Sequence, residues 1–143
     1  MAPRARRKYS IMDVTADIGI ITSAPDLATL YENAAYALFD LMCDMREVAS
    51  AVETEIAVEG IDAPSTMVNW LNELLYIFEA RSLLFGDFRV YSADPMQVRA
   101  VAKGEEFDPS RHKVIRHIKA VTYHRLKVMR AGDSWEAEVL FDI

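Results

Sequence analysis

Apolar residues recur at helical spacing in two stretches of the chain. Such a stripe is typical of an amphipathic helix that packs on a core. Ser23 or Asp26 can cap the first helix, and Pro25 suits its first turn. Pro64-Ser65 marks the start of the second. The two stripes are Leu27, Leu30, Ala34, Leu38 and Leu41, then Met67, Leu71, Leu74 and Phe78.

The remaining residues mostly alternate between apolar and polar, which predicts half-buried strands. The predicted strands are 9–12, 18–22, 52–59, 88–91, 98–102, 118–129 and 135–141, and the last two form a hairpin around 131–133. Helices do not alternate regularly with single strands in this order. We therefore predict an α+β fold, in which two helices pack on a mostly antiparallel β-sheet.

The length of 143 residues favours a single domain, spanning residues 9–143. Residues 1–8 are rich in Arg and Lys, and we expect a short disordered arm there. No apolar run reaches the ~20 residues that a membrane span needs, and no apolar stretch follows the arm as in a secretory signal. The single cysteine, Cys43, lies in an apolar stretch, so we expect a core thiol in a reducing, cytoplasmic setting.

The net charge is −6, and it falls to −10 without the four basic residues of the arm. A body this acidic repels a phosphate backbone, so direct, tight binding of nucleic acid by the folded part is not expected. An acidic body suits cation binding or docking on a basic partner. Phosphate-binding glycine loops and nucleophile-elbow motifs are absent from the sequence, which argues against stand-alone catalysis.

Carboxylates gather at two separate places in the sequence. Asp13 and Asp17 lie four apart between two predicted strands, and Asp142 stands beside the terminal Ile143. Side-chain and terminal carboxylates this close repel each other unless a cation lies between them, and Ca²⁺ or Mg²⁺ would suit such oxygen ligands. The simpler interpretation is a capped turn and a solvated chain end, and the sequence leaves both open.

The predicted strand at 118–129 carries Lys119 and His124. Lys119 is either a functional cation or an edge residue whose stem covers apolar surface. We expect His124 to be partly buried and hydrogen-bonded. His112 and His117 are five residues apart with no glutamate between them, so a helical zinc site of the kind that uses an i, i+4 pair is not predicted.

From residue 9 to residue 143 the chain resembles the archease family. Six segments carry the resemblance, and together they are far more specific than any one alone. They are Asp13-Val14-Thr15-Ala16-Asp17-Ile18-Gly19, Ala37-Leu38-Phe39-Asp40-Leu41-Met42, Trp70-Leu71-Asn72-Glu73-Leu74-Leu75-Tyr76, residues 104–112 (GEEFDPSRH), Lys119-Ala120-Val121-Thr122-Tyr123-His124, and the ending Phe141-Asp142-Ile143.

The resemblance implies an accessory protein of a GTP-dependent tRNA-splicing RNA ligase, which promotes guanylylation and multiple turnover of that ligase. It also implies a metal site at Asp17, Asp142 and Ile143, with calcium the most expected ion and magnesium or manganese as alternatives. Lys119 is implied to be functional near that site. The ligase, and not this protein, would bind GTP, manganese and RNA.

Val14 stands where the family motif has a histidine. Valine neither ligates a metal nor hydrogen-bonds, so the site is weaker if that histidine orients an aspartate, and function is impaired or specialised if it acts in the partner. The alternative function is a chaperone or protein-binding module with a structural ion. An independent metal-dependent hydrolase is a third hypothesis, which the lack of a visible base–nucleophile pair disfavours.

Overall fold

The computed structural model describes residues 9–14 and 17–143. The predicted basic arm, residues 1–8, lies outside this part of the chain, as do Thr15 and Ala16. The described elements follow the predicted order, and all strand pairings are antiparallel. They are β1 (Ser10–Val14), β2 (Asp17–Ala24), α1 (Leu27–Met42), η1 (Met45–Glu47), β3 (Val52–Glu59), α2 (Ala63–Arg81), β4 (Leu83–Asp94), β5 (Gln97–Glu106), β6 (Ala120–Ala131) and β7 (Ser134–Asp142).

Both helices begin at an aspartate. The Asp26 side chain accepts a hydrogen bond from the backbone N–H of Thr29, so Asp26 is the N-cap of α1 and Pro25 lies just before it. Asp62 and Ser65 form a capping box at the start of α2, with a proline in the first turn. The predicted start of α2 at Pro64-Ser65 is therefore one to two residues late, because its cap precedes the apolar stripe.

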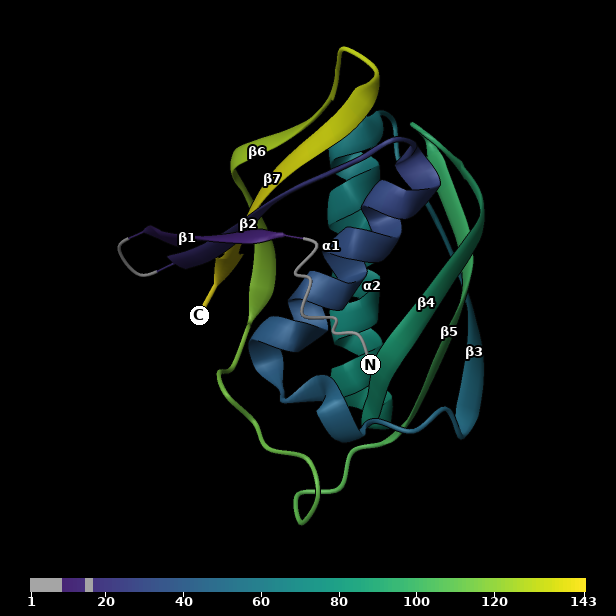
Figure 1. Ribbon diagram of the computed structural model, residues 1–143, viewed down its shortest axis with the longest axis vertical. Helices are drawn as coiled ribbons and strands as arrows, with labels where there is room; N and C mark the ends of the chain where they lie inside the picture. The colour runs from purple at the N-terminus through teal and green to yellow at the C-terminus, as the bar shows by residue number, and fades with distance from the viewer. Residues whose placement is uncertain (1–8, 15–16) are drawn as a thin grey trace.

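The strands form two sheets and not one. Their orders are β1-β2-β7-β6 and β3-β5-β4, and the two helices lie between the sheets (Figure 1). Phe39 of α1 packs against Phe78, Phe85 and Phe88 in the shared interior, with ring centroids 5.7–6.3 Å apart. The predicted α+β class is confirmed, and the α-helical stripes serve as core on both sides.

The final hairpin is less regular than its alternation predicts. Between Thr122 and Lys127 the β6–β7 register shifts, and Arg125 lies inside this irregularity with a φ of 56°. A bulge turns the strand locally and changes which side chains face the core. His124 is exposed, so the prediction of a partly buried histidine is wrong; its backbone N–H donates to the Thr122 hydroxyl, 3.0 Å away.

None of the helices in the described part of the chain combines the length and apolarity that a membrane span requires. Cys43 lies in the core directly after α1, as predicted. Burial raises the pKa of its thiol to about 11, so this cysteine stays protonated near neutral pH and is a poor nucleophile.

Candidate functional site

The two predicted aspartates meet at one end of the four-stranded sheet. Asp17 opens β2 and Asp142 closes β7, and the two residues are direct partners in the antiparallel β2–β7 pair. Direct partners project from the same face of a sheet, with Cβ atoms about 4.5–5.5 Å apart. Asp17 is half-buried and Asp142 is exposed. Residues 125 apart in the chain thus place two carboxylates side by side.

A row of paired residues crosses all four strands at this end. Val14 pairs with Asp17, Asp17 with Asp142, and Asp142 with Ala120. In Figure 1 the C-terminus lies beside the start of β6. Asp13 and Val14 belong to β1, but their side chains lie outside what the structure describes. The valine in place of the family histidine therefore belongs to the row by backbone register alone, while the first aspartate of the motif, Asp13, pairs with Ile18 next to the row.

Lys119 joins this row through its backbone. Its N–H donates to the carbonyl of Asp142 at 2.8 Å, directly before β6 begins. The side chain is exposed, and none of the ion pairs found among the described residues includes it. The ammonium group is thus available to a binding partner, while the main chain fixes its position at the carboxylate end of the sheet.

Ile143 follows Asp142 and is 46 % exposed. Within the described residues, no three side chains from His, Cys, Asp and Glu gather into a group that could hold a metal ion. A cation at this end would therefore need oxygens beyond the two aspartate side chains. The donor set is made of oxygen only, which fits a hard cation.

Helix α2 holds the start of β6 in place. The side-chain oxygen of Asn72 accepts a hydrogen bond from the backbone N–H of Val121 at 3.1 Å. Val121 is buried and lies two residues after Lys119. Sequence reasoning missed this role, although Asn72 stands at the centre of the second-helix motif. A polar residue between Leu71 and Leu74 on an otherwise apolar helix face was the available signal.

A second buried anchor fixes the segment between β5 and β6. The Glu105 carboxylate accepts hydrogen bonds from the backbone N–H of Ala49, from Arg111 and from His112. The backbone N–H of Asp108 donates to Nδ1 of His112 at 2.9 Å, so the proton of the neutral ring lies on Nε2, which donates to Glu105. His112 is thus a buried structural residue, consistent with the prediction that it forms no helical zinc pair with His117.

The donors around Glu105 shift its titration. They lower the pKa of this carboxyl to about 2, with the Ala49 N–H as the largest cause and His112 next. The segment then runs on to the end of α1, where Ile115 N–H and the Arg116 guanidinium donate to the last carbonyls of that helix at 2.7 Å each. The family-like turn at 104–112 therefore positions the path that leads to Lys119.

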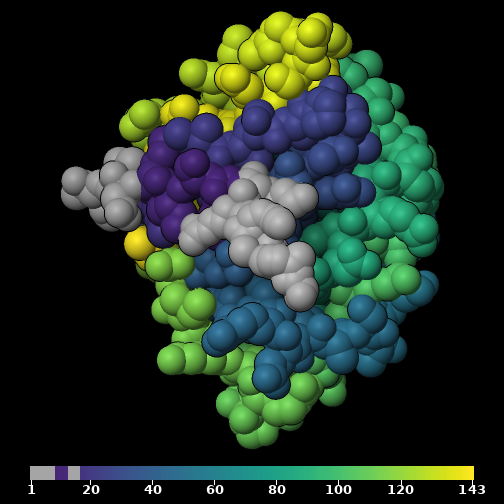
Figure 2. Space-filling view, in the orientation of Figure 1, coloured from purple at the N-terminus to yellow at the C-terminus, as the bar shows by residue number. Residues whose placement is uncertain are grey.

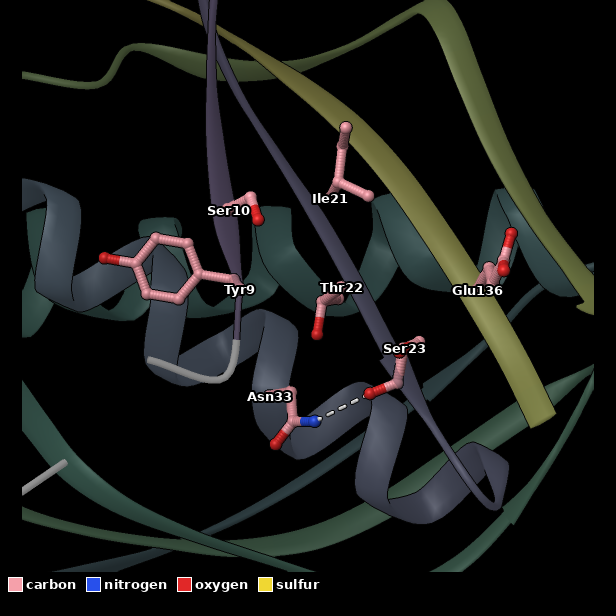
Figure 3. A pocket seen from close by; sticks show the side chains of 7 residues that line it. All are labelled: Tyr9, Ser10, Ile21, Thr22, Ser23, Asn33 and Glu136. Carbon is pink, nitrogen blue, oxygen red and sulfur yellow. Dashed lines mark hydrogen bonds between the residues drawn. The ribbon is translucent and has the colours of Figure 1, made fainter. Parts of the chain in front are cut away.

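A shallow depression of about 470 Å³ lies at the opposite end of β2 from Asp17. Figure 3 shows Ser10 of β1, Thr22 and Ser23 of β2, Asn33 of α1 and Glu136 of β7 around it. The Asn33 amide donates to the carbonyl of Ser23 at 3.3 Å. Among the described residues that line the depression, Glu136 is the single carboxylate and none belongs to the predicted metal site.

Known proteins resemble this chain in sequence and in fold. A sequence profile of the archease protein family matches residues 9–143. A protein archease from Methanosarcina acetivorans is 36 % identical over 145 residues, which cover 99 % of each chain. The solution structure of protein 1598 from Methanobacterium thermoautotrophicum superposes with a TM-score of 0.83 at 32 % identity, covering 96 % of this chain and 99 % of that one.

A crystal structure from Thermotoga maritima, described as an archease and possible chaperone, has a TM-score of 0.61 at 22 % identity. It covers 92 % of this chain and 94 % of its own, and at this identity it supports the fold alone. The profile match over nearly the whole chain and the 36 % identical relative decide the assignment. This chain belongs to the archease family.

Proposed function

We propose that this archease is a metal-binding accessory factor that activates a GTP-dependent tRNA-splicing RNA ligase, promoting its guanylylation and multiple turnover. The observation that carries the proposal is the direct pairing of Asp17 with Asp142, beside the backbone of Lys119. The identity of the partner rests on the family resemblance. The protein itself is not an enzyme in this proposal, and the ligase holds the nucleotide and the RNA.

Asp17, Asp142 and the carboxylate of Ile143 would hold the ion. Two carboxylates at cross-strand distance repel each other, and a divalent cation bound between them removes that repulsion. Calcium is the proposed ion because its flexible coordination by six to eight oxygens accepts carboxylates and water together. Magnesium and manganese are the alternatives. When bound, the ion supplies a fixed positive charge that orders this end of the sheet.

Lys119 is the proposed contact with the chemistry of the ligase. Its exposed ammonium can approach a phosphate or a carboxylate of the partner, while the hydrogen bond to Asp142 keeps its backbone next to the ion. The ion would thereby set the position from which Lys119 acts. We therefore expect loss of the ion and loss of Lys119 to impair the same step.

The terminal carboxylate offers the sharpest test. Adding three residues after Ile143 moves the α-carboxylate and leaves the core unchanged, so calcium affinity in calorimetric titration and ligase stimulation should both fall. Asp17→Asn and Asp142→Asn should do the same. The control is an equal extension before Met1. Unchanged calcium affinity in the extended chain would show that the terminus is not a ligand.

A chaperone or protein-binding module with a structural ion is the second candidate. The exposed apolar pair Val114 and Ile115, on the firmly anchored segment before β6, favours a protein contact of this kind. The molar ratio of this protein to the ligase distinguishes the activator from the chaperone. An activator should accelerate multiple-turnover ligation at substoichiometric amounts, whereas a chaperone should act only near equimolar amounts, by keeping the ligase in solution.

A further inference from the structure

The charges of this protein are strongly segregated along the chain. Between Asp108 and Asp133 there is no acidic residue, yet this stretch holds seven of the Lys and Arg residues and all three histidines. Outside it and the arm of residues 1–8, five Lys and Arg residues stand against all 22 Asp and Glu residues. The net charge therefore hides one basic surface on an acidic body. We call residues 111–130 the basic segment.

The basic segment is a continuous surface feature. In light green, the part before β6 runs along the lower edge of the molecule in Figure 2. It then continues as β6, the edge strand of the four-stranded sheet. The side chains of Lys113, Lys119, Arg125, Lys127 and Arg130 are all exposed, and Arg125 forms an ion pair with Glu138 of β7 at 3.4 Å. Charged residues protect a sheet edge from pairing with another strand, which explains why β6 is charged. This protection does not explain why the charges are all positive in a protein whose charges are mostly acidic.

Exposed rings lie among these cations. Tyr123 is 62 % exposed, and His117 and His124 are exposed as well. Single-stranded nucleic acids are bound by surfaces of this composition, where cations follow the phosphates and aromatic rings stack on bases. An acidic protein segment is the other polyanion to consider. Such a segment would most readily add as a strand to the β6 edge.

The bulge argues against that second occupant. The register shift between Thr122 and Lys127 interrupts β6 near its middle, and Arg125 adopts a left-handed conformation there. A bulge twists an edge away from an incoming strand and so disfavours strand addition. Recognition through side chains remains, and that mode suits phosphates and bases. The bulge also turns three consecutive residues, Tyr123, His124 and Arg125, toward solvent.

We infer that the basic segment binds the backbone of single-stranded RNA, with Tyr123 stacking on a base. The acidic net charge alone predicts that the protein does not contact RNA directly. The distribution of the charges along the chain instead predicts direct contact at the basic segment. The inference deepens the proposed function, because the basic segment includes Lys119 and would guide the RNA of the ligase to that end of the sheet. Repulsion by the acidic body keeps the affinity of the isolated protein low.

The test is fluorescence anisotropy of a labelled twelve-nucleotide single-stranded RNA, with the pure protein and no ligase, between 20 and 200 mM salt. Lys127→Gln/Arg130→Gln is compared with Arg89→Gln/Arg99→Gln, which removes the same charge from exposed positions of the three-stranded sheet. Thermal unfolding checks all variants, because Arg130 lies 5.8 Å from the Trp135 ring centroid. Tyr123→Leu tests stacking.

Each phosphate contact contributes about 0.7 to the slope of log affinity against log salt for a single strand. Lys127→Gln/Arg130→Gln should therefore make the slope less negative by roughly 1.4, and the control pair should leave it unchanged. Tyr123→Leu should lower affinity about tenfold without changing the slope.

An equal loss of RNA affinity in Lys127→Gln/Arg130→Gln and in Arg89→Gln/Arg99→Gln would overturn the inference, since binding would then follow net charge alone. Absence of binding at 20 mM salt would overturn it too. Binding of a labelled glutamate-rich peptide in place of RNA, sensitive to the same variants, would assign the surface to an acidic protein. Ligase stimulation that persists without RNA binding would leave the proposed function standing and reject this inference alone.

Discussion

At the scale of single residues, the structure separates side chains that build the site from side chains offered to a partner. Glu105 and His112 are buried and fully engaged, so their role is architectural. Lys119 has its backbone bonded and its side chain exposed. The main chain fixes the position of such a residue, so its side chain can be replaced without disturbing the fold. The effect of the side chain on function can then be measured apart from its effect on stability.

Replacing Lys119 by alanine should therefore change little in stability. We expect the free energy of unfolding to shift by less than about 0.5 kcal/mol, as for other exposed positions. Ligase stimulation should fall sharply, because the charge is lost. Chemical denaturation and a multiple-turnover ligation assay measure the two quantities. Parallel loss of stability and stimulation would instead make Lys119 a packing residue.

Glu105 predicts a pH dependence of stability. Its pKa is about 2 in the folded protein, below the ordinary value of 4.5. A lowered carboxyl pKa stabilises the fold above the unfolded value, and this contribution is lost as the pH falls from about 4.5 toward 2. Glu105→Gln should thus destabilise the protein at pH 7, with a difference from wild type that shrinks below pH 4.5. The control is the exposed neighbour Glu106→Gln, for which denaturant titrations should show no such convergence.

At the scale of elements, α2 and β6 are coupled by one hydrogen bond at a buried position. Asn72→Ala leaves the N–H of Val121 without its acceptor, at a cost of about 1–3 kcal/mol. The start of β6 would loosen, so ligase stimulation should also fall. Asn69→Ala is a matched control on the same helix, because Asn69 donates to the carbonyl of Glu59 at an exposed position. Denaturation of both variants decides whether the effect is local to β6.

Alternation and helical stripes predicted both α-helices and the existence of all seven strands in the described residues, because each of these elements buries one face. They did not predict the short 3-10 helix η1 (Met45–Glu47), and they placed the first residue of β4 five residues too late. Division into two sheets was not predictable, since pairing between distant strands leaves no local pattern. The exposed position of His124 was missed for a related reason. Its alternation breaks at a bulge, and a bulge depends on the partner strand β7.

The candidate site shows the same division. The family-like motifs singled out Asp17 and Asp142 as candidate site residues. Their direct pairing became visible only in the β2–β7 register of the structure. Asn72 and Glu105 were inside family-like segments, but their partners Val121 and Ala49 are 49 and 56 residues away. Long-range hydrogen bonds of this kind are invisible to spacing rules.

At the scale of the whole molecule, the proposed cation would link metal binding to the stability of the fold. A ligand that binds only the folded state stabilises it by about 2.7 kcal/mol at a hundredfold excess over Kd. Calcium should therefore raise Tm by several degrees, and a chelator should reverse the rise. The chain extended past Ile143 should show neither response. A rise in Tm that persists in Asp17→Asn/Asp142→Asn would place the bound calcium elsewhere.

The place of β7 in its sheet has a consequence for biosynthesis. This strand lies between β2 and β6, although it is the last of the described strands to be made. While the chain is growing, the three-stranded sheet can close early, but β2 and β6 keep open edges until residues 134–142 have left the ribosome. Contacts that span so much of the chain form slowly, and open edges invite aggregation. Completion of this sheet, and of the aspartate pair at its end, is therefore expected to follow closure of the three-stranded sheet.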